Sequence, residues 1–241
     1  MAAVSLPNTS LSANDTRILN ALFDPETLPS SISRSRDLSI IDTSLPPHPT
    51  IPSSQISTLE TEQNELVRSI TSESTPAAIQ NAITQEDEVI QEHPTYASAF
   101  LNRAMLRRMG MEAALPEGMS IFEQPESDLD LLFADLSRAI ALCVPSVSST
   151  TAVSAYQARI LRTAFSHRAY LYLKAAEIEV EVKGKGKGDL EELASGDFAA
   201  AARYGDEVAR EMSVRTNPYA KMCGAIVRNA LAEERKEAMS Q

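Results

Sequence analysis

Two segments of this chain repeat one helical pattern, in which an aromatic residue is followed four positions later by an alanine. Phe100 and Ala104 form the first instance, and Phe165 and Ala169 form the second. A small residue at this spacing lets a second, antiparallel helix pack closely against the first. Each segment also precedes a second helical stretch of small and apolar residues, so the sequence predicts an all-α protein made of stacked helix pairs. The second stretches are residues 135–140 and 197–202.

The arrangement predicted from this pattern is a tetratricopeptide-like α-solenoid of three helix pairs with a C-terminal capping helix. Asn217 and Pro218 open the last helix, since asparagine is a good cap and proline is well tolerated at the first helical position. The apolar face of this helix carries Met222, Ile226 and Ala230. We expect it to close the open end of the stack, because solenoids need a capping element.

The N-terminal segment differs in composition from the rest of the chain. Residues 1–55 hold seven of the 13 prolines and many serines, so this segment is predicted to be mostly disordered. Within it, residues 14–23 combine a helix cap with an apolar stripe and predict a short amphipathic helix. Residues 56–241 form the predicted helical repeat domain, interrupted by loops at 111–126 and 183–196.

Charge, hydropathy and cysteine content limit the expected partners and the expected cellular location of the protein. The formal net charge of −11 opposes contact with a phosphate backbone, so nucleic acid is not expected as a partner. No apolar run reaches the roughly 20 residues that a membrane span needs. Cys143 and Cys223 form no disulfide framework and are typical of thiols in a reducing compartment. We therefore expect a soluble protein of the cytoplasm, with the nucleus as an additional location.

The sequence offers no catalytic or metal-binding constellation. His48, His93 and His167 lie in unrelated contexts, and none has a second ligand four residues on. No serine lies in a nucleophile elbow, and neither cysteine has a catalytic signature. The prediction is a protein with no cofactor, no metal and no enzymatic activity.

Several segments of the chain resemble the tetratricopeptide repeat protein 36 family of small three-repeat proteins. The most specific match is the Asn-Pro-Tyr-Ala sequence at 217–220. The resemblance implies an all-helical adaptor without catalysis, whose members bind heat-shock 70 chaperones and are linked to the control of tyrosine breakdown. The first repeat matches poorly, and both loops are longer than in the family. The matching segments are 14–25, 102–104, 162–171 and 197–223.

In such repeats the first helix of each pair lines a concave groove that holds a peptide. Chaperone-binding repeats grip an acidic C-terminus there with lysine, arginine and asparagine side chains, through charge-assisted hydrogen bonds. Only Asn102 matches that set cleanly, so a different extended or helical peptide is favoured. The predicted groove residues are Asn102, Met105, Arg108, Thr163, His167, Tyr170 and Lys174.

Structural roles for some of these residues are open alternatives. Asn102 has two alternatives, to cap a turn or to form a hydrogen bond to a neighbouring helix. Tyr170 and Met105, at helical spacing, fit the core as well as the groove. Arg103 and Arg168 occupy equivalent positions after the two aromatic residues, where an inter-helix salt bridge is expected.

Three functional hypotheses follow, and the third is an enzyme whose turnover would depend on His167 or Cys223. The first is an adaptor or co-chaperone that binds a heat-shock 70 chaperone or a client peptide in its groove. The alternative is a regulator that docks on a metabolic enzyme, in tyrosine catabolism by the family resemblance, through its outer face or loops. The identity of the protein partner and the oligomeric state do not follow from the sequence.

Overall fold

The computed structural model confirms the all-α class. Every named element in the part of the chain that it describes is a helix, and β structure is confined there to two isolated bridges. The predicted helix at 14–23 and residue Ala230 lie outside the described residues. The described residues are 41–116, 118–144, 152–220, 222–224, 226 and 229.

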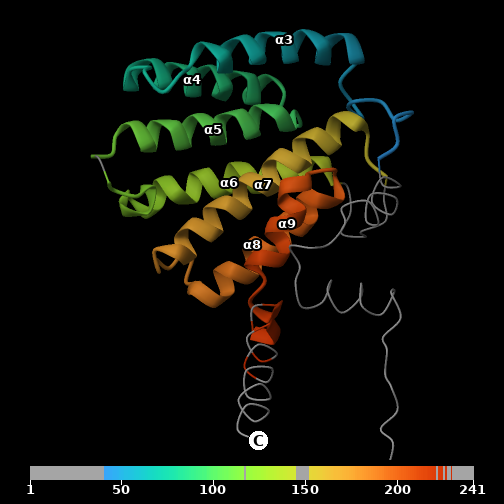
Figure 1. Ribbon diagram of the computed structural model, residues 1–241. Coiled ribbons are helices and arrows are strands. Elements are labelled where there is room, and N and C mark those ends of the chain that lie inside the picture. The colour runs from blue at the N-terminus through green and yellow to red at the C-terminus, as the bar shows by residue number, and fades with distance from the viewer. Residues whose placement is uncertain are drawn as a thin grey trace, which may run out of the picture.

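The helices stack in chain order, with α3 and α4 at one end and α8 and α9 at the other (Figure 1). Helices α4 to α9 pack mainly on their neighbours in the chain, whereas α3 lies against α5, which also contacts α7. The first helices of successive pairs therefore lie next to one another. The elements are α3 (Ser53–Ser69), α4 (Pro76–Glu92), α5 (Ala97–Ala113), the 3-10 helix η3 (Ile121–Glu123), α6 (Glu126–Cys143), α7 (Ala155–Glu177), α8 (Lys187–Arg203) and α9 (Glu207–Thr216).

Side-chain caps define where three of the helices begin. The hydroxyl of Thr75 accepts from Ala78 N at 3.2 Å at the start of α4, and Pro76 occupies the first position. Ser154 forms a capping box with Gln157 at the start of α7. Asp206 caps α9. These caps satisfy backbone N–H groups that would otherwise lack partners at the helix ends.

The aromatic and small residues of the repeated pattern lie in the core, as predicted. Phe100 is 9% exposed, and Ala104 packs in the same apolar cluster as Ala139, with neither alanine exposed to solvent. In the second instance, Ala169 has no exposed surface in the cluster between α7, α8 and α9, and Phe165 is partly buried against that cluster. Because alanine leaves room for the facing backbone, the helices of each pair approach closely.

An arginine–aspartate pair joins the two helices of each of these pairs. Arg103 of α5 donates to both carboxylate oxygens of Asp135 of α6, at 2.9 and 2.5 Å. Arg168 of α7 donates to both oxygens of Asp197 of α8, at 2.6 and 2.8 Å. Each guanidinium also lies over the aromatic ring three residues earlier, at 5.4 and 5.6 Å from its centroid. The predicted inter-helix role of both arginines is confirmed.

Residues 41–52, which we call the strap, pack on the helical body although they belong to the segment predicted to be mostly disordered. Asp42 N donates to Val153 O at 2.9 Å, which holds the strap beside the start of α7. His48 is 8% exposed, and its Nε2 lies 3.0 Å from Thr95 O at the start of α5. Its Nδ1 accepts backbone N–H groups of the strap, so Nε2 is the donor to Thr95. The strap therefore joins the first pair to the later ones.

Glu60 of α3 connects the first helices of the three pairs, α3, α5 and α7, at one point. Its carboxylate accepts from Tyr96 OH at 2.6 Å, from Tyr156 OH at 2.9 Å and from the guanidinium of Arg159. Burial raises the pKa of Glu60, but the hydrogen bonds from Tyr96, Arg159 and Tyr156 outweigh it and the net shift is downward. An ionised Glu60 thus holds α3 to the starts of α5 and α7.

The C-terminal cap differs from the prediction. Met222 and Ile226 are 54% and 60% exposed, so they do not close the stack. Instead α9 packs on α8, where Ala209 is buried and Met212 lies against the same cluster. The sequence did not point to α9 because its apolar face is short, and a ten-residue helix gives a weak periodic signal.

Helix α8 begins inside the segment that the sequence assigned to a loop at 183–196. It starts at Lys187 and includes Gly188, a residue that disfavours helix by about 1 kcal/mol. Leu190 and Ala194 have no exposed surface, and burial of this face outweighs the glycine penalty.

We expect the Asp197→Ala substitution to lower the free energy of unfolding by about 2–4 kcal/mol, because it leaves the Arg168 guanidinium without its carboxylate at a site where both side chains are below 20% exposed. Asp197→Asn, which keeps the shape, should recover part of the loss. Urea unfolding followed by circular dichroism measures both effects.

The matched control is Lys187→Ala, which removes one charge from the exposed pair with Glu179 and should leave stability almost unchanged. Equal losses for Asp197→Ala and Lys187→Ala would contradict a stabilising role for the inter-helix pair.

Candidate protein-binding site

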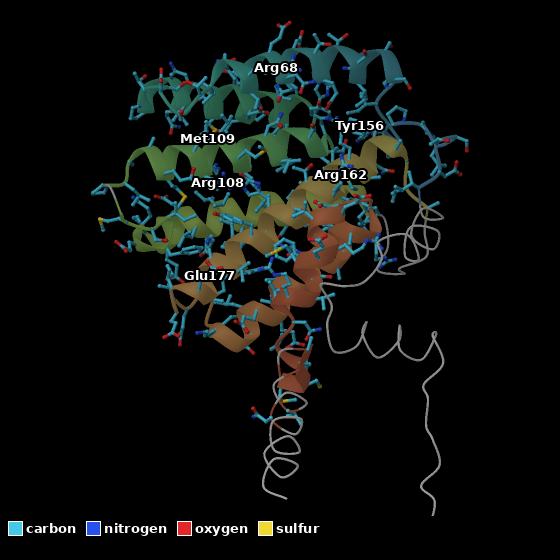
Figure 2. The ribbon with its side chains drawn as sticks, in the orientation of Figure 1. Arg68, Arg108, Met109, Tyr156, Arg162 and Glu177 are labelled. Carbon is cyan, nitrogen blue, oxygen red and sulfur yellow. The ribbon has the colours of Figure 1, made fainter. Side chains whose placement is uncertain are left out.

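The predicted groove residues come from two adjacent helices. Asn102, Met105 and Arg108 belong to α5, and Thr163, His167, Tyr170 and Lys174 belong to α7. Figure 2 shows Arg108 and Met109 along α5, Arg162 along α7, and Glu177 at the C-terminal end of α7. The structure divides the predicted set into a buried polar network around Asn102 and a partly exposed cluster around Tyr170.

Asn102 belongs to a buried polar network between α3, α4 and α5. Its Nδ2 lies 3.2 Å from the side-chain amide of Gln63, which is 5% exposed. The same amide lies 2.5 and 2.6 Å from the two carboxyl oxygens of Glu86, a residue with no exposed surface. Contacts this short need a proton between the groups, supplied by an amide nitrogen or by the protonated carboxyl. The alternative of an inter-helix hydrogen bond thus describes Asn102 in this structure.

Glu86 is held neutral by its surroundings. Burial raises its pKa to about 8, although the hydrogen bond of Asn102 and the charge of Arg103 lower it in part. A neutral carboxyl costs far less to bury than a carboxylate, which explains how a glutamate is tolerated between three helices.

Tyr170 lies at the centre of the second group. The Arg108 guanidinium is 5.9 Å from the centroid of its ring and the Lys174 ammonium is 5.7 Å from it. Tyr170 is 43% exposed, so this cation–aromatic cluster is open to solvent. Each cation also has a carboxylate on its own helix: Arg108 Nε lies 3.3 Å from Glu112 Oε1, and Lys174 Nζ lies 2.7 Å from Glu177 Oε2.

His167 lies one turn before Tyr170 on α7. Burial, and then the positive charge of Arg108, lowers its pKa to about 4, so the imidazole is neutral at pH 7. Its Nε2 is buried and makes no hydrogen bond within the described residues. Arg108 Nε is also buried and without a hydrogen bond there, but Glu112 Oε1 lies 3.3 Å away and forms an ion pair with it. Buried polar atoms normally have partners, so His167 Nε2 is an exception in this cluster.

A pocket of about 360 Å³ adjoins this cluster. The connection between α5 and α6 folds back against α7, so that Leu115, Met119 and Phe122 face the pocket that Tyr170 and Lys174 also line. The sequence predicts this connection only as a loop. The apolar residues of this connection were the sequence signal for a packed or binding segment, because large apolar side chains in a loop are either buried or part of a binding surface.

The remaining predicted residues take other positions. Thr163 is partly buried, and its hydroxyl donates to Arg159 O of its own helix at 3.1 Å. Met105 is partly buried against the main core. Ser166, which the prediction did not include, donates to Asp206 at 2.6 Å and so connects α7 with α9.

The described residues contain no group of three or more metal-binding side chains. None of the helices in the described ranges is long and apolar enough to cross a membrane.

The fold and the site together define an all-α protein of packed helix pairs, with a cation-flanked aromatic pocket on its surface. Comparison with known proteins identifies the family of the chain. It is 41% identical over 246 residues to the "L-tyrosine degradation gene cluster protein hmgX" of Aspergillus fumigatus, and the match covers 93% of each protein. The chain belongs to the same family as that protein. No protein-family model matches the chain, and no solved structure matches it.

The resemblance to the tetratricopeptide repeat protein 36 family was wrong. The relative that covers nearly the whole chain is named for a tyrosine degradation gene cluster and not as a tetratricopeptide protein, and no family model of such repeats matches. The physical reason is that an aromatic residue followed by an alanine four positions later is a packing requirement. Any pair of closely packed antiparallel helices can meet it, so the pattern identifies the helix pair but not the family.

Glu86 makes the stability of the protein depend on pH. The unfolded carboxyl ionises near its ordinary pKa of 4.5, whereas the folded one stays protonated up to about 8. Between these values the unfolded chain binds fewer protons, so stability falls as pH rises, by about 1 kcal/mol per pH unit where the effect is steepest.

Glu86→Gln mimics the neutral carboxyl and should remove this dependence. We expect the variant to match the wild type near pH 5 and to be the more stable protein at pH 8, as measured by urea unfolding at each pH. Parallel pH profiles for the two proteins would contradict a neutral Glu86.

Proposed function

We propose that this protein acts without catalysis, by docking on an enzyme of tyrosine breakdown. The observation that carries the proposal is the 41% identity, over 93% of both chains, to a protein named for an L-tyrosine degradation gene cluster. Sequence similarity along the full length supports a shared role and not only a shared fold. The expectation of a heat-shock 70 chaperone as the partner receives no support from this relative.

The structure supports an interaction protein in a second way. We assign its helix pairs to an open α-solenoid-like array, in which each pair contacts the next and the first helices form a continuous row. Arrays of this kind present extended surfaces for other proteins. Glu60 and Glu86, whose pKa values are shifted, lie in hydrogen-bonded contacts between helices and act in packing, and His167 lies in the cluster around Tyr170.

The experiment is affinity capture from an extract of cells of the source organism grown on tyrosine, with the purified full-length chain as bait and the bare tag as reference. Mass spectrometry of the bound fraction should show one enzyme of tyrosine breakdown enriched over the reference. Gel filtration of that purified enzyme with the purified chain then tests direct contact.

Two variants show which surface makes the contact. Arg108→Glu changes the cluster around Tyr170 and should weaken capture, whereas Val208→Asp, at a residue that is 71% exposed on α9, should leave it intact. Enrichment of a heat-shock 70 chaperone without any such enzyme would contradict the proposal, as would turnover of a pathway intermediate by the chain alone.

A further inference from the structure

The described residues that follow α9 are helical and carry an exposed apolar stripe. Asn217 caps their first turn, since its side-chain oxygen accepts from Tyr219 N at 2.9 Å. Tyr219, Met222 and Ile226 follow one another at spacings of three and four, so they share one helix face. Their side chains are 61%, 54% and 60% exposed. We call these three residues the C-terminal stripe.

The C-terminal stripe lies at the end of the helix array. The chain leaves the stack after α9 (Figure 1), and α9 itself packs on α8 through Ala209 and Met212. More than half of each side chain in the stripe is open to solvent, so the described part of the body does not bury it. Single exposed apolar side chains are common on proteins, but three on one helix face form a patch of the kind that marks a binding surface.

The N-terminal segment 14–23, which lies outside the described residues, has a stripe of matching character in its sequence. Its apolar residues are Ile18, Leu19, Leu22 and Phe23, which share one face of a helix. A helix of this length is marginal on its own in water, so it needs a surface on which its apolar face is buried. In helical form the two stripes are about 8 and about 10 Å long, so one can cover the other.

The chain brings this segment within reach of the C-terminal stripe. Ile41 is fixed beside Val153 at the start of α7, and residues 24–40 connect it to the segment. A connection of that length spans up to about 55 Å when fully extended. Ser166 of α7 donates to Asp206 at the start of α9, so the route along the body follows part of α7 and then α9. These two helical stretches are together about 33 Å long, which is well within the reach of the connection.

Attachment to the same chain favours this occupant over a second copy of the protein. Two parts of one chain whose linker can span the gap meet at an effective concentration in the millimolar range. A second copy has no such advantage, and two chains that each carry a net charge of −11 repel one another.

We propose that residues 14–23 dock as a helix on the C-terminal stripe of the same chain. Ile18, Leu22 and their apolar neighbours then cover Tyr219, Met222 and Ile226. The docked segment caps the end of the array, which solenoids require and which the C-terminal stripe does not provide by folding back on the stack. This inference does not depend on which enzyme the protein binds.

Cysteine cross-linking tests the contact in the full-length chain. Cys223 is exposed at the edge of the C-terminal stripe, whereas Cys143 is 1% exposed and does not compete for the reagent. Asn20→Cys places a second reactive thiol in the segment, and Ser33→Cys places it in the connection as the matched control. Each purified variant is treated with a short bis-maleimide, and mass spectrometry of the digest identifies the linked peptides. Circular dichroism confirms that each variant is folded.

Asn20→Cys should link to Cys223 of the same molecule about tenfold faster than Ser33→Cys, because docking holds the segment at the stripe. Ile226→Asp in the Asn20→Cys background should remove this advantage, since a carboxylate replaces an apolar contact. Val208→Asp makes the same kind of change at a position of α9 that is 71% exposed and outside the stripe, and it should leave the rate unchanged.

Equal rates for Asn20→Cys and Ser33→Cys would overturn the proposal, as would a rate that Ile226→Asp leaves unchanged. Cross-links between two molecules in place of those within one would also overturn it, because they would identify a second copy as the occupant of the stripe. Gel electrophoresis under denaturing conditions separates these products, since only the second kind doubles the mass.

Discussion

The arginine–aspartate pair inside each of the helix pairs α5/α6 and α7/α8 is the interaction on which the rest of the structure depends. Asp135 and Asp197 are almost buried on the second helices, and each is held by both arms of a guanidinium on the first. Removing one partner would leave a charge in a low-dielectric setting, so only one rotation and register of the two helices is tolerated. Fixing that rotation also fixes which residues of α5 and α7 point away from the second helices, and Arg108 and Tyr170 are among them.

Successive helix pairs are held together by Arg103 with Asp87, by Arg168 with Ser137, and by contacts near the helix starts. Glu60 gathers hydroxyl and guanidinium donors from α5 and α7, and the strap holds the start of α7 beside that of α5 through Val153 and Thr95. Both connections join residues far apart in sequence, so they set the spacing between pairs. The cluster around Tyr170 is a consequence, because Arg108 and Tyr170 belong to different pairs and meet only at that spacing.

The sequence predicted what local pattern and repetition can determine. The equivalence of Arg103 with Arg168 follows from their places after Phe100 and Phe165, and it gave the salt bridges correctly. The positions of Arg108, His167 and Tyr170 on the first helices followed from the same count. Asn102 follows the same count, but in the structure its side chain lies against Gln63 of α3. The pattern of one helix does not reveal such a long-range contact. The family assignment failed for the reason that packing patterns are shared by unrelated helix pairs.

The pocket was beyond prediction because it depends on how the connection between α5 and α6 folds. That connection is longer than two antiparallel helices require, since helix–helix connections usually need only about 2–8 residues. Its extra apolar residues gain burial by lying on α7 of the following pair, and this turns an open row of helices into a site with a second wall. A regular array would present Tyr170 and Lys174 on one open surface of the first helices. With the connection folded against α7, these two residues share a pocket with Leu115 and Met119, so the long connection and not the repeated helix pair gives this part of the surface its shape.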